Sequence, residues 1–132
     1  MTLSPYSTNK PIRIINAINY IEQPTMCTCG QTCLAMLADV SVDEIYKVMG
    51  NDSTTSYENL TYTFDYYGFR HRLRKDSPKI LPDICLLKVQ FPEYWHGILF
   101  FKKQFYDPKF GIMDIYPSNG RIDFKEFIEV YQ

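Results

Sequence analysis

The sequence is poor in several features that mark particular classes of protein. Its 132 residues include only two histidines, four cysteines and one tryptophan, and 14 basic residues nearly balance 15 acidic ones. This balance gives no electrostatic reason for nucleic acid or a membrane surface to be the main partner. The longest apolar run, residues 33–38, is far shorter than the roughly 20 residues that cross a bilayer. We therefore expect no nucleic-acid partner and no membrane span.

The cysteines do not form the pattern of a disulfide-rich protein. The first residues lack the basic stretch and apolar core of a secretory signal. Without such a signal, four cysteines are more typical of free thiols than of a disulfide framework. Cys27 and Cys29 are also too close in the chain for a relaxed disulfide. We expect a reducing compartment, the cytoplasm.

What the sequence does contain is enough apolar material for one folded domain. Hydrophobic residues make up 45% of the chain, with 11 tyrosines and nine phenylalanines. A chain of this length supports a single core. No internal repeat or low-complexity segment interrupts it. We expect one domain over residues 1–132, of which 1–11, polar and punctuated by proline, form a loose lead-in.

The first half of the chain favours helices. Residues 30–39 have the apolar spacing of a buried helix. Ser41 and Glu44 form a capping-box pattern before a second short helix, which should end at Gly50. A third helix is expected over about 56–68, where apolar residues recur at helical spacing.

The second half favours strands separated by turns. A lone extended segment is expected earlier, over 12–18. The later strands are expected over residues 69–73, 83–89, 96–102 and 104–107. Residues 102–104 suit a hairpin turn. Helices followed by an antiparallel meander indicate an α+β fold, with N-terminal helices packed on an antiparallel sheet.

The C-terminal tail has a different spacing. Its apolar residues stand at i, i+3, i+4 and i+7, and are Phe124, Phe127, Ile128 and Tyr131. This spacing predicts a closing amphipathic helix.

Cys29 is the best candidate for a reactive thiol. It ends a polar loop and precedes Gly30 and the first expected helix. At a helix N-terminus the helix dipole and unpaired N–H groups favour thiolate over thiol. Cys33 and Cys85 lie in apolar runs and are expected to be packing residues. Cys27 is the rival thiol, but no glycine follows it.

A nucleophilic cysteine needs an imidazole and a group that orients it. His71 lies among basic residues that oppose an imidazolium, whereas His96 opens an apolar strand. Asp107 begins the turn that closes the next strand, so tight antiparallel pairing would bring its carboxylate beside His96. Gln23, six residues before Cys29, could donate a hydrogen bond to charge developing beside the sulfur. Each of the last three residues also has an ordinary explanation, as a strand histidine, a turn former and a loop residue.

Together these residues resemble the papain-like cysteine peptidases. The resemblance spans about residues 23–111 and rests on Gln23, Cys29 with Gly30, the apolar helix, His96 at a strand start, and Asp107 before a proline. It is strongest toward bacteriocin-processing (double-glycine leader) peptidase domains and their stand-alone relatives. It implies a papain-like fold with Cys29 as nucleophile, His96 as base and acid, Asp107 as the orienting group and Gln23 in the oxyanion hole. It also implies a peptide or protein substrate, with no cofactor and no metal.

Other interpretations remain open at this point. The same triad could serve a deamidase or an acyltransferase, since the fate of the acyl group distinguishes these. A catalytically silent or regulatory protein-binding module could use the same fold. Cys27, Cys29 and Cys33 with a histidine could also bind zinc, although the one-residue gap between the first two is unusual for zinc ligands.

Overall fold

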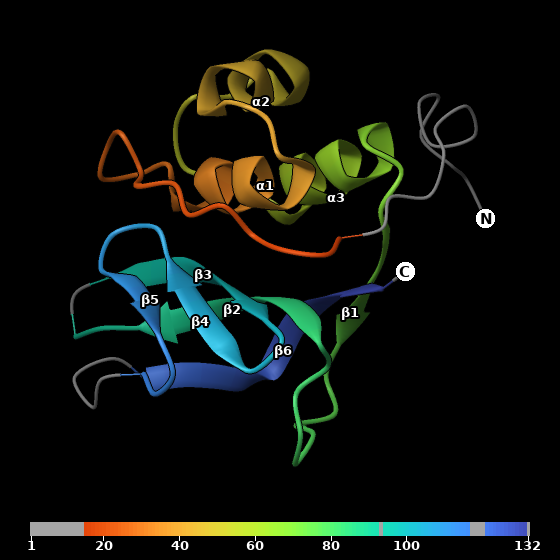
Figure 1. Ribbon diagram of the computed structural model, residues 1–132, viewed down its shortest axis with the longest axis vertical. Coiled ribbons are helices and arrows are strands. Elements are labelled where there is room, and N and C mark those ends of the chain that lie inside the picture. The colour runs from red at the N-terminus through yellow and green to blue at the C-terminus, as the bar shows by residue number, and fades with distance from the viewer. Residues whose placement is uncertain (1–14, 93, 117–120, 132) are drawn as a thin grey trace.

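The protein is built as two layers, three helices packed against a six-stranded antiparallel sheet (Figure 1). This computed structural model describes residues 15–92, 94–116 and 121–131. The expected lead-in and residues 12–14 of the expected extended segment lie outside that part of the chain. Residues 15–18 have no regular secondary structure. Within the described ranges, no helix has the length and apolar character to cross a membrane. The predicted α+β class is confirmed.

The helices lie close to their predicted positions. They are α1 (Cys29–Ala38), α2 (Val42–Met49) and α3 (Tyr57–Tyr66). In α1 every residue from Gly30 to Ala38 is buried, because the sheet covers one side and the other helices cover the rest.

Capping residues fix where α2 and α3 begin. The Ser41 hydroxyl accepts the N–H of Glu44 at 3.1 Å, as its capping pattern predicts, and α2 ends at Gly50 with φ of 72°. Ser56 and Asn59 form a reciprocal cap on α3.

The strands are β1 (Arg70–Arg74), β2 (Ile84–Gln90), β3 (Trp95–Phe101), β4 (Gln104–Asp107), β5 (Gly111–Met113) and β6 (Arg121–Tyr131). Their order in the sheet is β1-β6-β2-β3-β4-β5. The expected meander therefore exists from β2 to β5. The turn between β3 and β4 forms at Lys102 and Lys103, whose φ values of 44° and 69° suit a tight hairpin. The short strand β5 was not predicted.

The predicted closing helix is wrong, because its residues form β6. This strand pairs with both β1 and β2 and so lies inside the sheet. Phe127 packs in one apolar cluster, whereas Ile128 and Val130 pack in another. A strand with apolar residues on both faces has no clean alternation, and its spacing can imitate that of a helix.

The sheet separates two apolar clusters. Leu86 belongs to the larger one, between sheet and helices, whereas Cys85 and Leu87 belong to the smaller one. Successive strand residues point to opposite faces, so the smaller cluster lies on the face away from the helices. Cys33 and Cys85 are fully buried, as predicted for packing residues.

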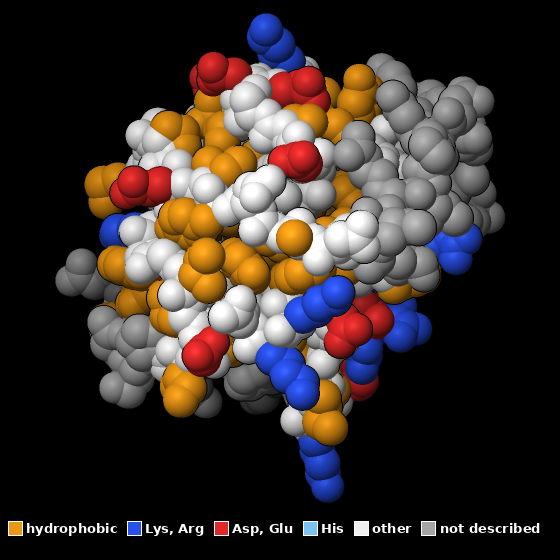
Figure 2. Space-filling view, viewed as in Figure 1, with side chains coloured by type: hydrophobic (Ala, Val, Ile, Leu, Met, Phe, Trp, Pro, Cys, Tyr) orange, Lys and Arg blue, Asp and Glu red, His pale blue; other side chains and the backbone are white. Residues whose placement is uncertain are grey.

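The surface has no single dominant charge. Figure 2 shows hydrophobic side chains gathered where the helical layer meets β4 and β5, with Lys and Arg side chains toward the lower right, over β1 and the segment after it. Two arginines of β1, Arg72 and Arg74, each have a side-chain nitrogen 2.8 Å from a carboxylate oxygen of Glu129.

The position of Leu34 predicts how α1 contributes to stability. Leu34 is 1% exposed and belongs to the larger cluster. Replacing it with alanine should lower the free energy of unfolding by about 2–5 kcal/mol, through lost apolar contact and a residual cavity. Cys29→Ala, at the start of the same helix, should leave the melting temperature nearly unchanged. Thermal and denaturant unfolding of both variants checks this, and equal losses would show that Cys29 is a structural residue.

Candidate active site

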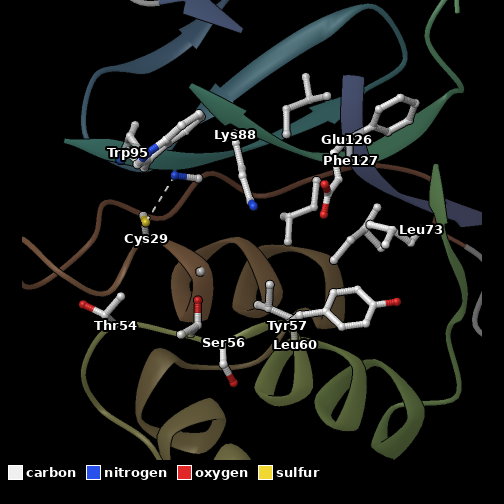
Figure 3. A pocket seen from close by; sticks show the side chains of 17 residues that line it. Cys29, Thr54, Ser56, Tyr57, Leu60, Leu73, Lys88, Trp95, Glu126 and Phe127 are labelled. Atoms are coloured by element: carbon white, nitrogen blue, oxygen red, sulfur yellow. Dashed lines mark hydrogen bonds between the residues drawn. The ribbon is translucent and has the colours of Figure 1, made fainter. Parts of the chain in front are cut away.

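Cys29 is the first residue of α1, as its sequence predicted to within one position. The preceding residue, Thr28, is buried but its side chain caps no N–H of the helix. The backbone N–H of Gly30 helps to lower the pKa of the Cys29 thiol. The N–H of Gly97 on β3 donates to the sulfur at 3.3 Å and is the dashed line in Figure 3. A backbone donor from the sheet therefore reaches this sulfur.

Gly30 is required by the close packing beside Cys29, whereas a side chain at Gly97 would be in ordinary contact with the sulfur. A Cβ at Gly30 would lie 2.6 Å from the hydroxyl of Thr55, so the loop before α3 leaves no room for a side chain there. A Cβ at Gly97 would contact the Cys29 sulfur at 3.5 Å. The lack of space for a side chain at position 30 explains why a glycine follows Cys29 in the sequence.

His96 lies in β3, 3% exposed, next to the rings of Phe91 and Phe110. Its Nε2 lies 2.6 Å from Oδ1 of Asp107. The strand register accounts for this contact. Leu99 pairs with Tyr106, so Asp107 stands opposite Ile98, and His96 is two residues further along the same face.

Asp107 is fully buried, and hydrogen bonds surround its carboxylate. Oδ1 accepts the His96 ring together with the backbone N–H groups of Lys109 at 2.8 Å and Phe110 at 3.1 Å. Oδ2 accepts the hydroxyl of Tyr116 at 2.5 Å. Burial raises the pKa of Asp107, but the bonds from His96 and Tyr116 outweigh it and lower the pKa below its ordinary value. The carboxylate therefore stays ionised.

The same balance operates on Cys29 and His96. Burial raises the pKa of Cys29, but the hydrogen bonds from the His96 ring and the Gly97 N–H lower it below the ordinary thiol value. Burial lowers the pKa of His96, but the bonds to Asp107 and Cys29 raise it to about 9. Because Nε2 faces Asp107, Nδ1 is the ring nitrogen left for the sulfur. Both shifts move the pair toward a thiolate and an imidazolium.

Gln23 lies in the segment that precedes α1. Its backbone N–H bonds the carbonyl of Pro108 at 2.8 Å, and the nearby Tyr20 hydroxyl bonds the carbonyl of Asp107 at 2.5 Å. The Gln23 side chain donates to the carbonyl of Thr25 at 2.8 Å, and its Oε1 is buried without a partner. Gln23 is thus tied to the turn that holds Asp107.

A cleft of about 300 Å³ opens beside Cys29, between the helices and the sheet (Figure 3). Its walls are mainly apolar, and Leu60, Leu86 and Ile128 are among them. Lys88 and Glu126 extend into it from β2 and β6. Such a cleft is suited to a substrate side chain next to the reacting atom.

The structure brings together Cys29, His96 and Asp107, and sequence reasoning missed two of the residues around them. Tyr116 and Tyr20 both bond Asp107, yet neither lies in a pattern that indicates such a contact. Gly97 contacts the sulfur only through its backbone N–H, and no pattern of residue types in the sequence indicates such a contact.

The other candidate residues have separate roles. His71 lies in β1 with Nε2 2.8 Å from Asp65, so an acidic side chain accompanies it despite its basic neighbours in sequence. Cys27 is exposed. Within the part of the chain that the structure describes, no three histidine, cysteine or acidic side chains group as metal ligands, so the zinc site considered from sequence does not form there.

The comparisons with known proteins identify no family. No protein-family model matches the sequence, and no curated protein matches it either. The site's function is therefore argued from its geometry.

The geometry predicts unusual reactivity at Cys29. Iodoacetamide should alkylate Cys29 rapidly at pH values well below the ordinary thiol pKa of about 8.5, because the thiolate already exists there. Cys27, exposed and with no imidazole bonded to it, is the internal control. In His96→Ala the advantage of Cys29 should disappear. Peptide mapping of the alkylated protein across pH measures both rates, and equal pH profiles at the two cysteines would contradict the ion pair.

Tyr116 should tune the imidazolium through Asp107. In Tyr116→Phe the carboxylate loses a donor, interacts more strongly with His96, and should raise the pKa of that ring above about 9. The NMR titration of the His96 ring should therefore move to higher pH. Tyr20→Phe removes a bond to the Asp107 carbonyl only and is the matched control. An unchanged His96 titration in Tyr116→Phe would mean that this tyrosine does not act on the ring through Asp107.

Proposed function

We propose that this chain is a papain-like cysteine hydrolase, a peptidase that cleaves a peptide or protein amide. Cys29 is the nucleophile, His96 the general base and acid, and Asp107 the group that orients His96. The observation that carries this proposal is the buried His96–Asp107 pair beside the Cys29 sulfur, which accepts the N–H of Gly97, the residue that follows His96. A structural cysteine has no use for this arrangement, whereas a nucleophile gains its ionised form from it.

The reaction has two halves. The Cys29 thiolate attacks the amide carbonyl, a C–S bond forms, and the carbonyl oxygen becomes an oxyanion. The imidazolium of His96 gives its Nδ1 proton to the leaving nitrogen as the C–N bond breaks, which leaves a thioester and a neutral ring. Water then attacks the thioester while His96 takes a proton from it. The acid product leaves, and the thiolate and imidazolium are restored.

The oxyanion would be held by the backbone N–H of Cys29 and the side-chain amide of Gln23. A preorganised donor of this kind contributes on the order of 10²–10³ in rate. One amide hydrogen of Gln23 already bonds the Thr25 carbonyl, which fixes the side chain and leaves the second hydrogen for the oxyanion. The main-chain bond to Pro108 supports the same position.

The arrangement of the layers supports the papain-like assignment. The nucleophile begins a buried helix, while His96 and Asp107 come from neighbouring antiparallel strands that pack against it. The cleft beside Cys29 lies where the two layers meet. The four cysteines are free thiols, which fits a reducing compartment such as the cytoplasm.

Peptide cleavage tests the proposal. A mixture of peptides of diverse sequence should be cut by the wild-type protein, with the new termini identified by mass spectrometry. Cys29→Ala and His96→Ala should abolish cutting. Asp107→Asn should lower it by several orders of magnitude, because it removes the charge that stabilises the imidazolium.

Three outcomes separate the possibilities. Release of ammonia without new peptide termini would identify a deamidase instead. Transfer of the acyl group to an added amine would identify a transferase. Peptide binding without any of these reactions, together with ordinary thiol kinetics at Cys29, would identify a binding module.

A further inference from the structure

Beside His96, the protein exposes two large aromatic side chains outside the cleft. Tyr94 is 42% exposed and Phe110 53%. The Lys109 ammonium lies over both rings. We call these three residues the aromatic platform, whereas Trp95, 55% exposed, lines the cleft. Aromatic side chains exposed together at the edge of a reactive site mark a surface for another molecule more often than scattered apolar residues do.

The platform is built onto the catalytic ring. The Phe110 ring centroid is 6.2 Å from that of His96. Phe91 lies 6.3 Å from His96 and 6.1 Å from Phe110, and stacks on Tyr94 at 5.0 Å. A group that rests on Tyr94 and Phe110 is therefore close to the His96 ring.

Lys109 gives the platform its charge. Its Nζ lies 5.3 Å from the Tyr94 ring centroid, 5.2 Å from that of Phe110 and 3.5 Å from the Tyr94 hydroxyl. Among the residues that the structure describes, no carboxylate pairs with this ammonium. The Asp107 carboxylate, two residues before Lys109 in the sequence, is buried and already bonded to His96. The platform thus offers a positive charge held on aromatic rings.

The cleft and the platform are separate surfaces near Cys29. The cleft includes Trp95 but not Tyr94, Lys109 or Phe110. It also holds charges of both signs, Lys88 and Glu126, whereas the described part of the platform holds only a positive one. The two surfaces should therefore select different parts of a substrate.

We propose that the aromatic platform binds the leaving-group segment of the substrate, and that Lys109 favours an acidic side chain in that segment. This inference rests on the proposed peptidase function. His96 protonates the leaving nitrogen, so the segment that departs must start beside this ring, and the residues that flank the ring are the ones it meets. The preferred substrate is a peptide with an acidic residue shortly after the cleaved bond.

Three peptides that differ at one position test this inference. They share the same sequence before a cleaved bond found for the wild-type protein, and carry Glu, Gln or Lys two residues after it. In wild type, kcat/KM should fall from Glu to Gln to Lys by about two- to five-fold at each step, the range of an exposed ion pair. Added salt should reduce these differences.

Charge reversal supplies the decisive comparison. Lys109→Glu should reverse the order of the Glu and Lys peptides relative to the Gln peptide, which serves as the neutral reference within each variant. Lys79→Glu changes the net charge equally at an exposed loop position and should keep the wild-type order.

The outcomes keep the two proposals apart. Equal rates on all three peptides in wild type, unaffected by Lys109→Glu, would overturn the platform's role and leave the peptidase intact. A reversed order of rates in Lys79→Glu would also overturn the platform's role, since the net charge of the protein alone would then account for the peptide preference. No cleavage of any peptide by wild type would overturn the peptidase proposal, and the platform's role with it.

Discussion

The short hydrogen bond between His96 and Asp107 is the contact on which the rest of the site depends. A carboxylate with no exposed surface is costly unless every oxygen is bonded, and here four donors satisfy it. The buried negative charge then holds the imidazole in its charged form, and the charged ring in turn favours the Cys29 thiolate. Each ionisation therefore makes the next one possible.

These groups come from distant parts of the chain, so the fold itself assembles them. Cys29 begins the helical layer, and β3 and β4 belong to the sheet. Two hydrogen bonds join the layers at the same place, one from Tyr20 and one from the backbone of Gln23, both to carbonyls of the Asp107 turn. The segment before α1, which includes Tyr20 and Gln23, thus links the helix that carries the sulfur to the turn that holds the carboxylate (Figure 1).

Sequence reasoning selected Cys29, His96 and Asp107, which the structure brings together, because their local patterns are distinctive. Cys29 stands at the boundary between a polar loop and an apolar helix, and His96 and Asp107 bracket a hairpin whose turn residues are recognisable. The contacts of Tyr116 with Asp107, and of the Gly97 N–H with the sulfur, arise only when separate segments meet. No local pattern contains that information.

The error at β6 has a related cause. The tail residues Phe124, Phe127, Ile128 and Tyr131 stand at i, i+3, i+4 and i+7, the spacing that predicts a closing helix. In the sheet, Phe127 and Ile128 face opposite apolar clusters, and β6 lies between β1 and β2. A strand buried on both faces is specified by its neighbours in space more than by its own periodicity.

The most direct test of the central claim is the titration of the His96 ring by NMR, in wild type and in Cys29→Ser. If a thiolate and an imidazolium form the resting pair, His96 should remain charged through neutral pH and titrate near 9 in wild type. Its pKa should fall clearly once the sulfur is replaced by a hydroxyl that does not ionise. A ring that titrates near the ordinary histidine value of about 6.5 in both proteins would contradict the ion pair and with it the proposed nucleophile.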